Sequence, residues 1–289
     1  MRTAVVSISS FAAACLLSPL FPRNSVSQPP VVRIAHMAYY VSDLNRSRAY
    51  YHDFLGFDEA VTLKAADGSD PIAFFKINDN QYIELFQGAP KNYGFIHDIA
   101  FQTNGVGRTR IYLVAHGIMV PDAIGKDEAG NRCFEIIDPS GYTVRMIQYE
   151  PDSLTGRTHG KFMPDTRIST HIDHIGVLSK DKGAAANFYA TILGSENTGE
   201  NKLLVGNGPD RFEIGFERKP PTPARFHIKN HICLSTPDVP KLAAMLEAKP
   251  NYKQFRPIET HSLPNGKHVA ELYDPDGNRI EIMEPPKQN

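Results

Sequence analysis

The chain has 289 residues, of which 41% are hydrophobic and 22% are charged, and its formal net charge is −1. This length and apolar content are sufficient for two hydrophobic cores, which indicates two domains. The balanced charge, without a basic stripe, argues against nucleic acid as a partner.

The first 27 residues differ in composition from the rest of the chain. A short basic start precedes an uncharged apolar run at 4–21, and Ser25 and Ser27 fit the small residues that precede a cleavage site. We therefore expect a cleaved signal peptide at 1–27 and a periplasmic or secreted protein without stable membrane insertion once processed. An uncleaved anchor is one alternative, because the apolar run is nearly long enough to span a bilayer. Attachment as a lipoprotein through Cys15 is another.

From residue 31 onward, expected strands and helices follow one another in a repeating rhythm. In the first half we expect strands at 33–41, 71–77, 81–87, 95–103, 132–137 and 142–149, and helices at 44–56 and 106–116. A polar stretch with glycine and prolines at 151–170 is typical of a linker. In the second half we expect strands at 172–179, 202–206, 212–218, 230–236, 267–273 and 278–284, and helices that end at Gly194 and near Ala248. These elements form four β-α-β-β(-β) modules in two pairs, which is an α+β class of fold.

One turn-and-strand block occurs at the end of both halves. Asp-Pro-Ser-Gly at 138–141 and Asp-Pro-Asp-Gly at 274–277 each precede an alternating strand, and the two blocks are 136 residues apart. Asp-Pro-x-Gly fits a tight turn, because proline presets one φ angle and glycine tolerates a positive one. The two strands differ at one position, where Arg145 in the first corresponds to Glu281 in the second. This difference indicates that the two halves have different chemistry.

In the second half, residues with metal-binding side chains lie on four expected strands. These residues are His174, Glu213, His231 and Glu281. Their neighbours are mostly apolar, so alternation directs the His and Glu side chains away from the apolar face that we expect the helices to cover. A lone histidine on a strand is more often a satisfied, half-buried side chain. Four such residues at repeated positions instead favour a divalent transition metal with open coordination positions.

The matching residues of the first half include an arginine. They are His36, Glu84, His97 and Arg145. A guanidinium stays charged and only donates hydrogen bonds, so it cannot ligate a metal. We expect Arg145 to pair with Glu84 and the first half to be a metal-free scaffold. The alternative is that His36, Glu84 and His97 hold a second, weaker metal.

Three stretches carry a resemblance to a known superfamily. They are His-Met-Ala-Tyr-Tyr-Val at 36–41 with Tyr-Tyr-His-Asp-Phe-Leu-Gly at 50–56, His-Ile-Gly-Val at 174–177 with Phe-Tyr-Ala-Thr-Ile-Leu-Gly at 188–194, and Leu-Tyr-Asp-Pro-Asp-Gly-Asn-Arg-Ile-Glu at 272–281. They resemble the vicinal oxygen chelate superfamily, which includes glyoxalase I, extradiol ring-cleaving dioxygenases and bleomycin-binding proteins. The resemblance implies four βαβββ modules paired into two cupped mixed-sheet domains, at 31–150 and 171–286 with a linker at 151–170. It also implies a metal that chelates adjacent oxygens of the substrate.

The resemblance leaves two reactions open. Similarity to extradiol dioxygenases implies iron on His174, His231 and Glu281, and their Gly-x-His motif is matched by residues 266–268. Their tyrosine, however, is expected where this chain has Glu271, with Tyr273 two residues later on the same strand face.

Glu213 instead resembles the second glutamate of glyoxalase I, in which two Glu and two His hold zinc or nickel and a glutamate moves the proton. Glyoxalase I is usually cytosolic and depends on glutathione, which an exported protein would meet rarely. Our candidate catalytic residues are therefore Glu213, Tyr273 and His268, the last as an acid/base.

We interpret the chain as an exported, metal-dependent enzyme that acts on a small substrate with adjacent oxygens, as a dioxygenase or as a lyase or isomerase. The expected cofactor is Fe²⁺, or Zn²⁺, Ni²⁺ or Mn²⁺. The alternative is a metal-free small-molecule binding protein of the bleomycin-resistance type. The sequence leaves the substrate and the oligomeric state open, although two cups in one chain remove the need for a dimer to complete a site.

Overall fold

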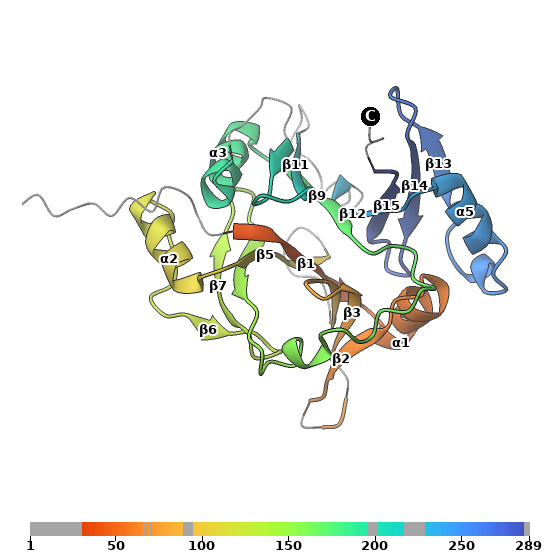
Figure 1. Cartoon of the computed structure of the whole chain (residues 1–289), viewed down its shortest axis with the longest axis horizontal. Coiled ribbons are helices and arrows are strands. Elements are labelled where there is room, and N and C mark those ends of the chain that lie inside the picture. The colour runs from red at the N-terminus through yellow and green to blue at the C-terminus, as the bar shows by residue number, and fades with distance from the viewer. Residues whose placement is uncertain are drawn as a thin grey trace, which may run out of the picture.

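The computed structural model describes residues 31–65, 67–69, 71–88, 95–195, 202–216 and 229–285, so the expected signal peptide lies outside the described residues. The described strands form two mixed sheets, one from each half of the chain, with few helices around them (Figure 1). The fold class and the two-domain organisation expected from the sequence are confirmed. Within the described ranges, no helix is both long and apolar enough to cross a membrane.

The first sheet has the strand order β2-β3-β4-β1-β5-β8-β7-β6. Its strands are β1 (Val31–Val41), β2 (Glu59–Leu63), β3 (Ile72–Asn78), β4 (Gln81–Gln87), β5 (Ile96–Thr103), β6 (Gly125–Lys126), β7 (Arg132–Ile137) and β8 (Thr143–Gln148). Its helices are α1 (Leu44–Arg48), the π-helix η1 (Ala49–Phe54) and α2 (Val106–Ala115). β1 and β5 pair antiparallel at the centre, and each pairs parallel with the last strand of its own module.

The second sheet repeats this arrangement in the order β10-β11-β9-β12-β15-β14-β13. Its strands are β9 (Ile172–Ser179), β10 (Lys202–Leu204), β11 (Arg211–Phe216), β12 (His231–Ser235), β13 (Glu259–Ser262), β14 (His268–Tyr273) and β15 (Arg279–Met283). The helices here are α3 (Lys182–Leu193) and α5 (Val239–Glu247), with the short 3-10 turn η3 (Tyr252–Gln254). A further 3-10 turn, η2 (Gly156–Thr158), lies in the stretch between β8 and β9. β9 and β12 are therefore the counterparts of β1 and β5.

Aspartates begin three of the helices, for a local reason. The carboxylates of Asp43, Asp181 and Asp238 accept hydrogen bonds from backbone N–H groups in the first turns of α1, α3 and α5. These N–H groups have no partner inside the helix, so a capping carboxylate stabilises the helix start. α3 ends at Gly194, whose φ of 65° is accessible to glycine at little cost.

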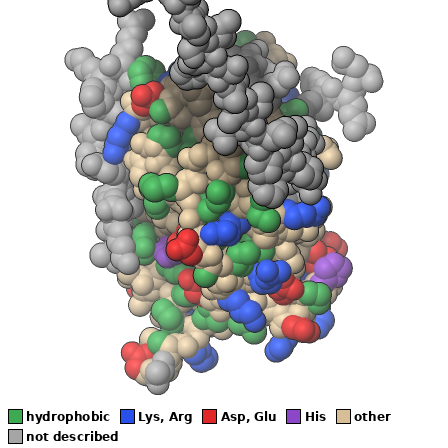
Figure 2. Space-filling view, turned by 90° about the vertical axis from the view of Figure 1, so that its left-hand side faces the viewer, with side chains coloured by type: hydrophobic (Ala, Val, Ile, Leu, Met, Phe, Trp, Pro, Cys, Tyr) green, Lys and Arg blue, Asp and Glu red, His purple; other side chains and the backbone are tan. Residues whose placement is uncertain are grey.

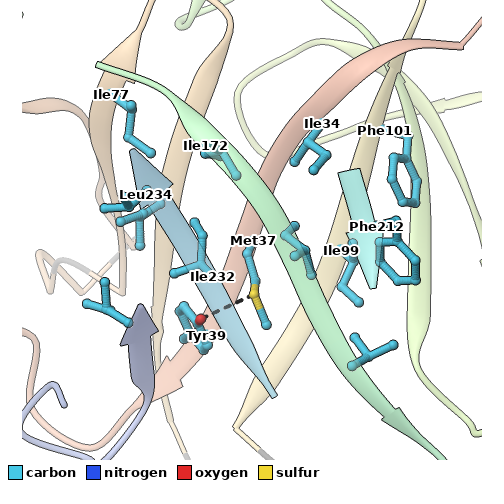
Figure 3. Close-up of a cluster of buried hydrophobic side chains, with 14 of the residues drawn as sticks. Ile34, Met37, Tyr39, Ile77, Ile99, Phe101, Ile172, Phe212, Ile232 and Leu234 are labelled. Carbon is cyan, nitrogen blue, oxygen red and sulfur yellow. Dashed lines mark hydrogen bonds between the residues drawn. The ribbon is translucent and has the colours of Figure 1, made fainter. Parts of the chain in front are cut away.

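The apolar faces of the two sheets pack against each other. Figure 3 shows Ile34 and Met37 of β1 beside Ile172 of β9 and Ile232 of β12, all within one continuous hydrophobic cluster. We expected the helices to cover these faces, but the apolar side of the central strands in each sheet is covered by the other sheet instead. The opposite face of each sheet is thereby left for the polar residues that the sequence singled out.

The two Asp-Pro-x-Gly turns also bind the domains to each other. Asp274, in the turn after β14, accepts a hydrogen bond of 3.1 Å from the hydroxyl of Tyr51 in η1. Asp138, in the matching turn of the first domain, accepts one of 3.0 Å from Tyr189 in α3. Each turn therefore holds a helix of the other domain, and the two contacts are related by the internal repeat.

The surface carries both signs of charge. Figure 2 shows the side of the molecule that is on the left in Figure 1, where α2 lies, and there Lys and Arg side chains are interspersed with Asp and Glu. This mixture agrees with the formal net charge of −1.

Candidate metal site

The structure brings the four predicted residues of the second half together on four neighbouring strands. Glu213 lies on β11, His174 on β9, His231 on β12 and Glu281 on β15. The Nε2 atoms of His174 and His231 are 3.1 Å apart, and Glu281 Oε2 is 3.1 Å from His231 Nε2. Glu213 Oε2 lies slightly farther away, 3.8 Å from His174 Nε2. The two histidines and Glu281 are buried.

The hydrogen bonds of the two imidazoles determine where their protons lie. His174 Nδ1 is 2.8 Å from the Asp173 carboxylate, and His231 Nδ1 is 2.9 Å from the backbone carbonyl of Lys229. Both partners are acceptors, so each Nδ1 carries the proton and donates it. Burial lowers the pKa of His231 well below its usual value. The Nε2 atom of neutral His231 therefore presents a lone pair toward Nε2 of His174.

This donor set fits a divalent transition metal. When both rings are neutral, these tautomers turn two lone pairs toward each other at 3.1 Å, an arrangement that a cation bound to both nitrogens stabilises. Metal–nitrogen bonds of about 2.0–2.1 Å place two neighbouring ligand nitrogens about 3.0–3.4 Å apart, as found here. The ligand atoms of His174, His231 and Glu281 all lie within 4.8 Å of one another. Two His and one carboxylate leave positions open for a substrate.

Asp173 orients His174, a role that was not expected from the sequence. The β9–β12 pairing slips by one residue here, so Asp173 is an extra residue on β9 between positions that pair normally. Such a bulge redirects a side chain, and here the Asp173 carboxylate reaches the adjacent imidazole and is itself bound by Arg211. A carboxylate behind a metal-binding histidine fixes the ring and increases its basicity. Its position next to His174 was the only signal in the sequence.

Gly176 provides the space for the imidazole of His231. The two residues are directly opposite each other on β9 and β12. A Cβ atom at Gly176 would lie 2.7 Å from both His231 ring nitrogens and still closer to Cε1. The matching pair of the first domain is Ala38 with the shorter Asp98. A glycine at 176 is therefore a steric requirement of the site.

The two oxygens of the Glu213 carboxylate are differentiated by Lys202. Lys202 Nζ is 2.8 Å from Oε1, whereas Oε2 is the oxygen that faces His174. Lys202 and Glu213 are directly opposite each other on β10 and β11. Both line a cavity of about 350 Å³ beside the site, together with His231 and Arg279.

Arg279 connects Glu281 to the predicted catalytic residue Tyr273. Its Nη2 atom is 2.8 Å from Glu271 Oε1 and 3.2 Å from Glu281 Oε2. The hydroxyl of Tyr273 donates to Glu271 Oε2 at 3.1 Å. Tyr273 therefore reaches the site only through Glu271 and Arg279. Without Arg279, the directly opposed carboxylates of Glu271 and Glu281 would repel each other.

The structure does not bring His268 into this group. Glu271 pairs with Glu281 and shares its face, so alternation places His268 on the opposite face of β14 together with Ala270. There His268 Nδ1 is 3.1 Å from Glu284. The acid/base role expected for His268 therefore has no geometric support.

The first domain carries a network of charges at the equivalent positions. Asp98, opposite Ala38, is the counterpart of His231, so the expected equivalence of His97 is wrong. His97 is an extra residue at a bulge of β5, and its ring instead stacks on Phe86 at a centroid distance of 3.7 Å. Alternation counted from the sequence fails at such a bulge.

The charges of this network are balanced by direct contacts. His36 Nδ1 is 2.9 Å from Glu84 and Nε2 is 2.8 Å from Asp98. Arg145 contacts Asp98 at 3.4 Å and Glu135 at 2.8 Å, so its expected pairing with Glu84 is replaced by these partners. Burial alone would lower the pKa of His36, but the two carboxylates outweigh it and raise the pKa from 6.5 to about 10.

A protonated imidazole with both nitrogens donating offers no lone pair to a metal. This arrangement favours the expectation that the first domain is a scaffold.

The two cupped sheets, and the His–His–Glu cluster found among the described residues, define a protein built from paired βαβββ modules around a candidate metal site. A family model described as "Glyoxalase/Bleomycin resistance protein/Dioxygenase superfamily" matches residues 33–146 and 171–282, and the chain belongs to this family.

Three further comparisons give relatives of the chain and of its fold. The "Uncharacterized protein YwbC" of Bacillus subtilis (strain 168) is 28% identical over 130 residues, which cover 40% of this chain and 99% of YwbC. The Mn(II)-bound glyoxalase from Novosphingobium aromaticivorans is similar in structure, with a TM-score of 0.64, 20% identity and coverage of 88% of this chain and 82% of that one. Homoprotocatechuate 2,3-dioxygenase from Arthrobacter globiformis is also similar in structure, with a TM-score of 0.65, 17% identity and coverage of 90% of this chain and 82% of that one. At these identities, the two structural similarities concern the fold alone.

Proposed function

We propose that the protein is an enzyme in which His174, His231 and Glu281 hold a divalent metal that binds two adjacent oxygens of a small substrate. The observation that carries the proposal is the pair of Nε2 atoms 3.1 Å apart, each on a ring whose Nδ1 already has an acceptor. A metal-free binding protein would have no need of two inward-facing lone pairs at this distance.

Proton transfer is the reaction class that the site supports best. A bound divalent ion would polarise a carbonyl and acidify the C–H beside it. Glu213 Oε2 would accept that proton, because Lys202 occupies the other oxygen and the carboxylate lines the cavity. The protein would thus be an isomerase or lyase, and proton transfer is also the chemistry of the metal-dependent glyoxalase type.

Extradiol-type oxygen chemistry is the second candidate, because two His and one carboxylate are also the donors of non-heme iron oxygenases. Oxygen consumption by the iron-loaded protein with catechols distinguishes it from proton transfer, which we expect to show no oxygen uptake.

Metal analysis of the purified protein tests the proposal first. We expect about one divalent ion per chain in the wild type and loss of that ion in Glu281→Ala. Glu213→Gln should keep the ion but lose solvent-deuterium exchange into small 2-hydroxycarbonyl compounds. A wild-type protein that binds no divalent metal would overturn the proposal.

Export remains a proposal as well. The uncharged run at 4–21 and the small residues at 25 and 27 support cleavage after residue 27. The mass of the mature N-terminal peptide from the expressing cell tests it directly, and an N-terminus upstream of residue 25 would refute it.

A further inference from the structure

The cavity beside the metal site has an uneven distribution of charge. It measures about 350 Å³, near the lower end of the range for ligand pockets. Apolar residues such as Val177 and Ile214 form part of its lining. The charged residues of the lining, within the part of the chain that the structure describes, are Lys202, Lys229, Arg279 and Glu213.

Two of the three cations have carboxylate partners close by. Lys202 is paired with Glu213 at 2.8 Å, and Arg279 is paired with Glu271 at the same distance. Lys229 has no acidic partner among the residues that the structure describes. It is also exposed and lies two residues before His231, the first residue of β12. Lys229 therefore adds an unbalanced positive charge to the wall of the cavity.

A metal ion in the site would increase this imbalance. A divalent ion on Glu281 leaves one positive charge, because the two imidazoles are neutral ligands. Glu281 would no longer be available to balance Arg279, which keeps only Glu271. With the two ion pairs cancelled, the ion and Lys229 together present two positive charges to a small, partly apolar cavity.

From this charge distribution, and resting on the proposed metal-dependent function, we infer that the substrate is a small organic dianion. Its adjacent oxygens bind the ion, and its second negative charge lies against Lys229. A neutral diol or hydroxyketone of the same size would leave Lys229 without a counter-charge in the complex.

Two probes of nearly equal shape test this inference. Oxalate and oxamate both present adjacent oxygens to a metal, but oxalate carries one more negative charge. Calorimetric titration of the Mn²⁺-loaded full-length protein with each gives the preference for oxalate over oxamate. We expect Lys229→Gln to reduce this preference about tenfold or more, the range expected for loss of a charged hydrogen bond. Lys229→Arg should retain most of it.

Lys241→Gln is the matched control, because Lys241 lies on the exposed side of α5 and lines no part of the cavity. It should leave the preference unchanged. If Lys229→Gln keeps the wild-type preference while binding Mn²⁺ normally, the dianion inference is wrong and the metal site stands. If the wild-type protein binds no Mn²⁺, Zn²⁺ or Fe²⁺, the proposed function and the inference both fail.

Discussion

Replacing Gly176 by alanine tests the geometry of the metal site through a residue that cannot itself be a ligand. The added Cβ would lie 2.7 Å from both ring nitrogens of His231, whereas ordinary contacts begin at 3.4 Å. The imidazole must therefore move by about 0.7 Å or more, while metal–ligand distances tolerate about 0.2 Å. Loss of one correctly placed ligand should exceed the 10–100-fold cost typical of an outer-shell change. We expect Gly176→Ala to weaken metal binding by about a hundredfold or more.

The assay is competition for Zn²⁺ with a chromophoric chelator, followed by thermal unfolding monitored by circular dichroism. The His231 ring borders the cavity and can rotate into it, so the fold should survive the substitution. Ala38→Gly is the control at the matching position of the first domain, where the partner is Asp98. It should cost about 0.5–1 kcal/mol of stability through chain entropy and leave metal binding unchanged. A folded Gly176→Ala variant whose metal affinity stays within threefold of the wild type would refute the reasoning.

Three further predictions concern buried carboxylates and one imidazole. Asp173→Asn removes the charge behind His174 and should weaken Zn²⁺ binding about 10–100-fold in the same competition assay, and an unchanged affinity would exclude an orienting role. Burial raises the pKa of Asp274 from 3.8 to about 6, so the folded protein holds a proton that the unfolded chain releases between these pH values. The free energy of unfolding should therefore fall by about 3 kcal/mol as the pH rises through this window, and urea unfolding of Asp274→Asn should lack this decrease. His36, with a pKa raised from 6.5 to about 10, should stay protonated from pH 6 to pH 8 in an NMR titration, and its contribution to stability should be full below pH 6.5 and decline steadily as the pH rises from there to about 10. A midpoint near the usual histidine value would contradict the charge network.

Much of the fold was predictable because its elements obey simple periodicities. The expected strand at 81–87 coincides with β4, and Gly194 ends α3 as expected. The edge strands β2 and β13 were not expected. In β13 every residue is exposed, so the strand has no apolar alternation by which the sequence could reveal it. Packing of the two sheets against each other was also not visible, because an apolar strand face does not identify the surface that covers it.

The candidate site was predictable where the strands are regular and failed where they bulge. The second-half residues lie on strands whose alternation is intact at His231 and Glu281, and they converge as expected. In β5 a bulge directs Asp98 inward, so the histidine next to it in sequence was assigned in its place. The partners Lys202 and Arg279 were missed because their role depends on cross-strand register, which the sequence does not specify.

If the two cups share one geometry, the first should become a metal site when its differences are reversed. Asp98→His and Arg145→Glu together would restore the donor types of the second cup and remove the balanced charges around His36. The double variant should still bind poorly, because Ala38 lies opposite position 98 and would obstruct an imidazole as a Cβ at Gly176 would.

Adding Ala38→Gly should raise the metal content from about one to about two ions per chain, measured by elemental analysis of folded protein. Removing the second-domain ion with Glu281→Ala in the same chain assigns the new ion to the first cup. A folded triple variant with the same metal content as the double variant, about one ion per chain, would refute this reasoning. Charge and the space at position 38 would then not be what distinguishes the two cups.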